Sequence, residues 1–133
     1  YVKKRQDKNF IIVDAGMNDL IRPSLYEAYH KILPLRNASE NIRQAERVDI
    51  VGPICESGDF FAKERLLPRL KEGDYVAIMG AGAYGFSMSS NYNSRRRVAE
   101  VMVVKDEPFV IRKRESYADL IRNELIPSFL SGR

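Results

Sequence analysis

The chain contains a single cysteine and no apolar run long enough to cross a membrane. One cysteine cannot form an internal disulfide, and we expect a reducing, cytoplasmic setting. A membrane-spanning helix needs about 20 consecutive apolar residues, and no secretory signal peptide is visible. These absences argue against a disulfide-stabilised scaffold and against a helical membrane protein.

A strong charge of one sign is also missing. Lysine and arginine number 22 against 18 aspartates and glutamates, a net charge of +4. The dense basic runs are Arg95-Arg96-Arg97 and Arg112-Lys113-Arg114, and the second is followed at once by Glu115. Nucleic-acid binding requires a continuous basic face with interleaved aromatic residues, so we do not expect it. Metal-ligand spacing is absent as well, and we expect no metal.

With 133 residues the chain has the length of one domain. It begins at Tyr1 in a stretch that resembles the interior of a strand. We therefore expect it to be a fragment or cleavage product of a longer protein.

The pattern of apolar residues predicts mainly β structure. Expected strands cover residues 1–4, 9–14, 27–32, 46–51, 75–79, 98–104 and 109–114. Residues 23–26 form a short helical turn or a loop, and residues 60–70 have helical spacing in part. Turns are expected at 5–8 and 106–108, and a polar linker at 34–45.

The sequence predicts one sizeable helix, over residues 116–130. Ser116 and Asp119 have the spacing of a capping box at its start. Short strands joined by turns indicate an antiparallel or mixed sheet, arranged as a sandwich or a barrel.

A glycine-rich motif at 80–85 opens a different interpretation, because it matches the dinucleotide-binding pattern G-x-G-x-x-G. It follows an expected strand, and Asp106 lies roughly where a ribose-binding acid would be. That fingerprint requires a helix starting at the third glycine, to hold the pyrophosphate. The serines and asparagines that follow Gly85 favour turns over a helix interior, which argues against a nicotinamide-nucleotide domain.

Three dense motifs remain. The first runs from Asp14 to Tyr26, the second is Cys55-Glu56-Ser57-Gly58-Asp59 after Gly52-Pro53, and the third runs from Gly82 to Asn93. In this order they resemble the C-terminal part of the diaminopimelate decarboxylases. The resemblance covers about Asn9 to about Leu120.

The resemblance implies a fold and an activity. It implies a C-terminal β-sandwich or barrel-like domain over 1–115, and a helix over 116–133 that packs against an N-terminal (β/α)8 barrel absent from this chain. It implies conversion of meso-2,6-diaminopimelate to L-lysine and CO2 with pyridoxal 5'-phosphate (PLP). The family's Schiff-base lysine and phosphate loop would lie in that barrel. The implied partner is a second identical subunit, with active sites shared between the two.

The resemblance also implies roles in the second motif. A lone cysteine is usually a small buried apolar residue, but Cys55 follows a Gly-Pro turn. By resemblance, Cys55 is the proton donor presented to the neighbouring subunit, and a mostly protonated thiol can act as an acid. Glu56, otherwise an exposed loop carboxylate, would bind the distal ammonium group of the substrate.

Arg22 and Tyr26 would hold the distal carboxylate of the substrate, where Arg22 would otherwise be a surface arginine. Tyr84, otherwise a packed aromatic, would contact the PLP phosphate or lie close to the cofactor and the substrate. The only histidine, His30, is more typical of a structural residue. Asn91-Tyr92-Asn93 and Arg95 match the family pattern too, with Arg96 in place of its usual proline.

Two further interpretations stay open. One is a related decarboxylase of the ornithine, arginine or carboxynorspermidine type. The other is an isolated, non-catalytic dimerisation module. The full clamp of Arg22, Tyr26 and Glu56 favours diaminopimelate, because decarboxylases for simple diamines have no distal carboxylate to hold.

Overall fold

The computed structural model describes residues 1–4, 8–35 and 45–131. They fall into two compact units, Tyr1–Ser89 and Ser90–Arg133. The expected turn at 5–8 and the expected linker at 34–45 lie largely outside the described residues.

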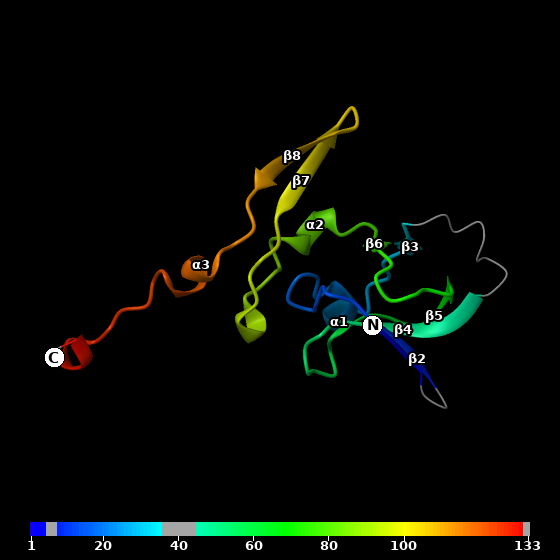
Figure 1. The fold of residues 1–133 in the computed structure, drawn as a ribbon, viewed down its shortest axis with the longest axis horizontal. Coiled ribbons are helices and arrows are strands. Elements are labelled where there is room, and N and C mark those ends of the chain that lie inside the picture. The colour runs from blue at the N-terminus through cyan, green and yellow to red at the C-terminus, as the bar shows by residue number, and fades with distance from the viewer. Residues whose placement is uncertain (5–7, 36–44, 132–133) are drawn as a thin grey trace. The chain divides into compact units, whose positions relative to one another are not determined.

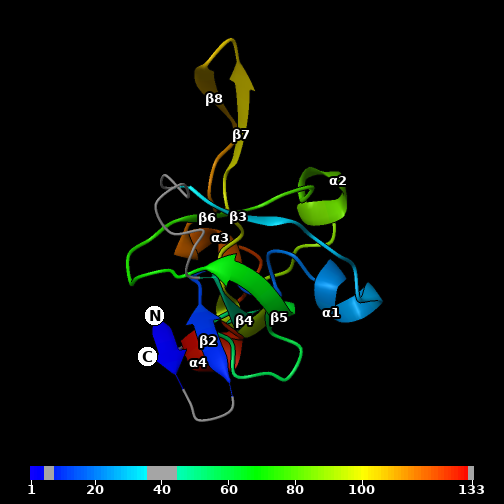
Figure 2. The same cartoon turned by 90° about the vertical axis from the view of Figure 1, so that its right-hand side faces the viewer.

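A four-stranded mixed sheet with the order β1-β2-β4-β5 dominates the first unit. Its strands are β1 (Val2–Lys4), β2 (Asn9–Ile12), β4 (Ala45–Val51) and β5 (Phe60–Pro68). Figure 1 and Figure 2 show β2, β4 and β5 beside one another. The β2–β4 pair is parallel, and the two outer pairs are antiparallel. The expected mainly β class is confirmed.

A smaller sheet pairs β3 (Ile32–Pro34) antiparallel with β6 (Val76–Ile78). The part of this unit that the structure describes also contains the short helices α1 (Arg22–Tyr26) and α2 (Gly82–Gly85). The interval 23–26 is therefore a helical turn. The expected strand at 75–79 is present in shortened form.

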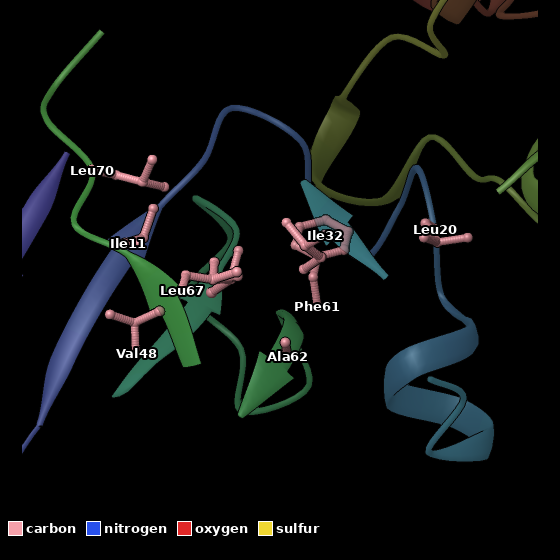
Figure 3. Close-up of a cluster of buried hydrophobic side chains, with 9 residues drawn as sticks. Ile11, Leu20, Ile32, Val48, Phe61, Ala62, Leu67 and Leu70 are labelled. Atoms are coloured by element: carbon pink, nitrogen blue, oxygen red, sulfur yellow. The ribbon is translucent and has the colours of Figure 1, made fainter. Parts of the chain in front are cut away.

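Buried apolar side chains from both sheets form one core (Figure 3). Val48 and Ile50 of β4 and Phe61 of β5 are its most deeply buried members, each 2% exposed or less. Ile32 joins from β3, and Leu20 joins from the segment that follows β2. Burial of Leu20 therefore fastens the first motif to the sheet.

The second unit contains a short 3-10 turn (Tyr92–Ser94) and the hairpin of β7 (Glu100–Val104) with β8 (Glu107–Arg112). Lys105 and Asp106 form the tight turn, with positive φ angles of 49° and 67°. This turn lies slightly before the one expected at 106–108. Every residue of β8 is exposed.

The helical interpretation of 60–70 is wrong, because this segment is β5. The register between β4 and β5 shifts twice, and Glu64 adopts a left-handed φ of 50°. A bulge of this kind interrupts the two-residue alternation of a strand. The apolar residues on either side of it then acquire spacings that resemble a helix.

Two other expectations need correction. Residues 27–31 form no strand, because Glu27 ends α1 in a left-handed conformation and pairing starts only at Ile32. The helix expected over 116–130 is divided into α3 (Tyr117–Ile121) and α4 (Ser128–Ser131). Pro127 disfavours helical backbone at the residue before it, so one continuous helix does not form. The capping box of Ser116 and Asp119 is confirmed.

Candidate functional site

The first two motifs follow the C-terminal ends of two neighbouring parallel strands, β2 and β4. Ile12 lies opposite Val51 in the parallel β2–β4 pair, so the segments after these strands start side by side. The Val13 N–H continues the ladder by donating to the Val51 carbonyl at 2.9 Å. Topology therefore brings the loop Asp14–Tyr26 next to the loop Gly52–Asp59.

Asp59 joins these two loops. Its side chain is buried, and the residue is 3% exposed. Oδ1 accepts a hydrogen bond from the Met17 N–H at 2.7 Å, and Oδ2 accepts one from the Ile54 N–H at 2.5 Å. Asp59 belongs to the second sequence motif, but no role was predicted for it.

Gly52 shows how tightly the Asp59 carboxylate is enclosed. A Cβ atom placed on Gly52 would lie 2.3 Å from Asp59 Oδ1, closer than atoms can approach. The Gly52 N–H also donates to the Asp59 carbonyl at 3.0 Å. The glycine before Pro53 was the signal in the sequence that could have pointed to this close contact.

Cys55 and Glu56 lie at the tip of the second loop. Buried Ile54 anchors the turn, whereas Cys55 is a free, exposed cysteine and Glu56 is exposed too. The Glu56 N–H donates to the Ile54 carbonyl at 2.9 Å, and the Asp59 N–H donates to the Glu56 carbonyl at 3.1 Å. The turn therefore presents a thiol and a carboxylate outward on a braced backbone.

Arg22, Tyr26 and Tyr84 form a second group. The Arg22 guanidinium carbon lies 5.7 Å from the centre of the Tyr26 ring and 5.2 Å from that of Tyr84. Both distances are within the range of a cation–π contact. The two tyrosines are exposed, at 60% and 61%. A guanidinium flanked by two exposed tyrosine side chains suits an incoming carboxylate.

Local backbone geometry supports this group. Pro23 follows Arg22 at the start of α1 and is buried, which suits its fixed φ angle. Tyr84 adopts a left-handed φ of 65° and interrupts the helical geometry of α2. Such a conformation in a bulky residue is unfavourable and is found preferentially at binding sites.

The same region argues against a nicotinamide-nucleotide domain. The third glycine of the motif, Gly85, closes α2 and starts no long helix in the described chain. Ala83 is extended, and Tyr84 is left-handed. The helix N-terminus that a pyrophosphate requires is therefore missing at this position.

The two groups of candidate residues are connected through α1. Gly58, in the Cys55 loop, lies so close to Ser24 that an added Cβ would be 2.7 Å from the Ser24 hydroxyl oxygen. Ser24 lies within α1, between Arg22 and Tyr26. The structure thus places all five predicted site residues on adjoining elements of the first unit.

His30 is buried at 5% exposure, and its Nδ1 lies 3.0 Å from the Met79 carbonyl oxygen. Because a carbonyl only accepts, Nδ1 carries the proton in this contact. Arg65 donates from Nη1 to the His30 carbonyl at 3.0 Å. These contacts are typical of a structural histidine that ties the start of β3 to the segment leading into α2.

In the second unit, Asn91 and Glu115 fix the base of the hairpin. Glu115 Oε2 accepts from the Asn91 side-chain amide at 2.6 Å and from the Arg97 N–H at 2.8 Å. The hydrogen bond from the Arg97 backbone, followed by that from Asn91, holds the pKa of Glu115 below its ordinary value. The end of the third motif therefore belongs to a structural cluster of Asn91, Arg97 and Glu115, here called the Glu115 clasp.

Among the described residues, no group of histidine, cysteine and acidic side chains is arranged to hold a metal ion. Within the same residues, no helix combines the length and apolar character needed to span a bilayer.

The comparisons with known proteins agree with one another. Residues 1–82 match the family described as "Pyridoxal-dependent decarboxylase, C-terminal sheet domain". The curated diaminopimelate decarboxylase of Aquifex aeolicus is 51% identical over 125 residues, which are 94% of this chain and 29% of that protein. This chain thus spans about 30% of the length of such relatives.

Solved structures give the same result. Diaminopimelate decarboxylase from M. jannaschii in complex with L-lysine is 42% identical, with a TM-score of 0.89 over 98% of this chain and 29% of that one. The Helicobacter pylori enzyme with L-lysine is 49% identical, with a TM-score of 0.83 over 93% and 29%. A lysine/ornithine decarboxylase from Vibrio vulnificus, 22% identical with a TM-score of 0.62, shares the fold.

Proposed function

Because this chain belongs to the pyridoxal-dependent decarboxylases, as their C-terminal sheet domain, we propose that it forms part of a diaminopimelate decarboxylase. The proposed enzyme is cytoplasmic and converts meso-2,6-diaminopimelate to L-lysine and CO2. The observation that carries the proposal is the Arg22 guanidinium between Tyr26 and Tyr84, beside the loop of Cys55 and Glu56.

Arg22, Tyr26 and Glu56 grip the end of the substrate that does not react. Diaminopimelate carries an amino acid group at both ends, so removal of one carboxylate requires recognition of the other end. The planar Arg22 fork matches a carboxylate, and the Tyr26 hydroxyl adds a donor. Glu56 supplies the opposite charge for the distal ammonium group.

Cys55 delivers the proton that replaces the departing CO2. A thiol is a weak acid that can release a proton near neutral pH. The exposed tip of its loop allows Cys55 to reach a reacting carbon outside its own subunit. We therefore assign a homodimer in which each Cys55 and Glu56 serve the partner's site.

PLP, the cofactor proposed for this enzyme, supplies an electron sink for the decarboxylation when it is bound. The described residues fit one edge of such a group. The Tyr84 side chain is exposed, and neither Gly82 nor Gly85 has a neighbouring atom within 4 Å of an added Cβ. Tyr84 would contact the cofactor phosphate or the substrate beside it.

Exposed apolar surface supports a larger assembly. Phe109, Val110 and Ile111 of β8 are exposed, and so are Leu125 and Phe129 near the C-terminus. A two-stranded hairpin with apolar side chains on both faces is marginal in water unless other protein covers it. We propose that residues 1–115 act as the β-domain and that 116–133 pack against a PLP-binding barrel.

The test is lysine and CO2 release by the full-length protein that contains this chain. Meso-diaminopimelate should be decarboxylated faster than ornithine, arginine or lysine, each offered separately as an alternative substrate that lacks the second amino acid group. A site that hydrogen-bonds a polar group can discriminate by about 10⁴-fold against analogues without it. Faster decarboxylation of one of these alternative substrates would favour the interpretation as a related decarboxylase. No decarboxylation of any substrate by PLP-loaded protein would favour a dimerisation module.

A further inference from the structure

We propose that Asp59 is a positioning residue, whose buried carboxylate locks the Cys55–Glu56 turn onto the segment that carries Arg22. The inference rests on the proposed function for its catalytic consequence. Its structural part stands on the hydrogen bonds and close contacts of Asp59 alone.

The Asp59 carboxylate has unusual hydrogen-bond partners. Asp59 is 3% exposed, and both side-chain oxygens accept from backbone N–H groups, those of Met17 and Ile54. Among the described ion pairs, none involves Asp59. A buried carboxylate is unfavourable without strong hydrogen bonds, so the two loops must keep these N–H groups aimed at it.

The two N–H groups that bind the Asp59 carboxylate belong to different loops. Met17 belongs to the loop that leads into α1 and Arg22, whereas Ile54 directly precedes Cys55. One carboxylate therefore connects the turn proposed to serve the partner's site to the segment proposed to hold the substrate in the chain's own site. Gly58 packed on Ser24 adds a second contact between the same two segments.

The contacts of Asp59 have a consequence for catalysis. A proton donor must lie within hydrogen-bond reach of the reacting atom, and misplacement by about 1 Å can cost about 100-fold in rate. The Cys55 side chain is exposed, so its position depends on the backbone of its turn. Asp59 holds that backbone at Ile54 on one side and through its own carbonyl and N–H on the other.

Asp59→Asn is the main variant, because it keeps the size of the side chain but replaces one acceptor by an NH2 donor. That donor would face the N–H of Met17 or of Ile54. Asp49→Asn is the matched control. Asp49 is also a buried aspartate, at 7% exposure, and it accepts from the Lys8 side chain and the Glu64 N–H in the middle of the sheet.

In the full-length PLP-bound protein, Asp59→Asn should lower kcat for diaminopimelate by about 10- to 100-fold. Hydrogen exchange should quicken at the Met17 and Ile54 amides. Asp49→Asn should leave kcat within about twofold and quicken exchange at Glu64 instead. Gly52→Ala, which drives a methyl group into the Asp59 carboxylate, should reproduce the kcat loss.

Equal kcat losses in the Asp59 and Asp49 variants would reduce Asp59 to a general stabilising residue and overturn the proposal. Unprotected Met17 and Ile54 amides in the wild-type protein would overturn it without any variant. If the wild-type protein does not decarboxylate diaminopimelate, the proposed function fails. The exchange experiment still decides whether Asp59 joins the loops.

Discussion

Replacing Arg22 by lysine keeps the positive charge but removes the planar fork that lies between two tyrosine rings. In the structure the guanidinium carbon is 5.7 Å from the Tyr26 ring centre and 5.2 Å from that of Tyr84. These contacts hold the fork in one orientation before a ligand arrives. A lysine ammonium is a point charge on a flexible stem and offers no bidentate match to a carboxylate.

The magnitude follows from one lost charge-assisted hydrogen bond, which contributes about 1.5–3 kcal/mol. At about 1.4 kcal/mol per tenfold, this predicts a rise in KM for diaminopimelate of about 10- to 100-fold. The turnover number should change far less, because the lost contact is to the end of the substrate that does not react. Each ring contact adds about 0.5–1 kcal/mol to the orientation of Arg22.

Steady-state kinetics of the full-length Arg22→Lys protein would measure this effect. L-lysine, the proposed product, keeps the carboxylate that is not removed, so its inhibition constant should rise by a similar factor. Cadaverine, which has no carboxylate, should bind as it does to the wild-type protein. Equal weakening of lysine and cadaverine, or a KM within about threefold of wild type, would refute the carboxylate role of Arg22.

Three further predictions concern other residues. Cys55→Ala should lower kcat far more than it weakens substrate or PLP binding, as measured by turnover and cofactor titration; parallel losses would argue against a proton donor. Glu56→Gln should raise KM for diaminopimelate, and an unchanged KM would remove Glu56 from the clamp. Glu115 has a lowered pKa in the folded chain, so its stabilising contribution is present above its ordinary value of 4.5 and is lost as the pH falls through the lowered pKa. The chemical shift of the Arg97 backbone amide in an NMR titration should follow that acid transition. A shift insensitive to pH below 4.5 would contradict the hydrogen bond from the Arg97 N–H to Glu115.

The sequence predicted strands well where apolar residues alternate with polar ones or form a continuous run. The apolar run at 10–13 and the segment 46–51 both became strands of the main sheet. Bulges are harder to predict, because the left-handed Glu64 depends on contacts with the paired strand β4, where the Asp49 side chain accepts from the Glu64 N–H. The alternation of apolar and polar residues at 27–32 likewise predicted a strand that does not form, because α1 ends at Glu27 in a left-handed conformation.

The candidate site shows the same division. The sequence motifs and the family resemblance predicted Arg22, Cys55 and Tyr84, because the roles of these residues depend on the identity of their side chains, which a motif records. Asp59 was missed because its partners are backbone N–H groups of Met17 and Ile54, which carry no sequence signature. Only the parallel β2–β4 pairing brings those groups to one carboxylate.

The most direct test of the central claim is a crystal structure of the full-length protein with L-lysine bound. We expect the ligand carboxylate within about 3 Å of the Arg22 guanidinium, with Tyr26 as a second donor. We also expect Glu56 and Cys55 of the partner subunit at the same ligand. A lysine carboxylate bound away from Arg22, or a site without Cys55 and Glu56, would contradict the assignment.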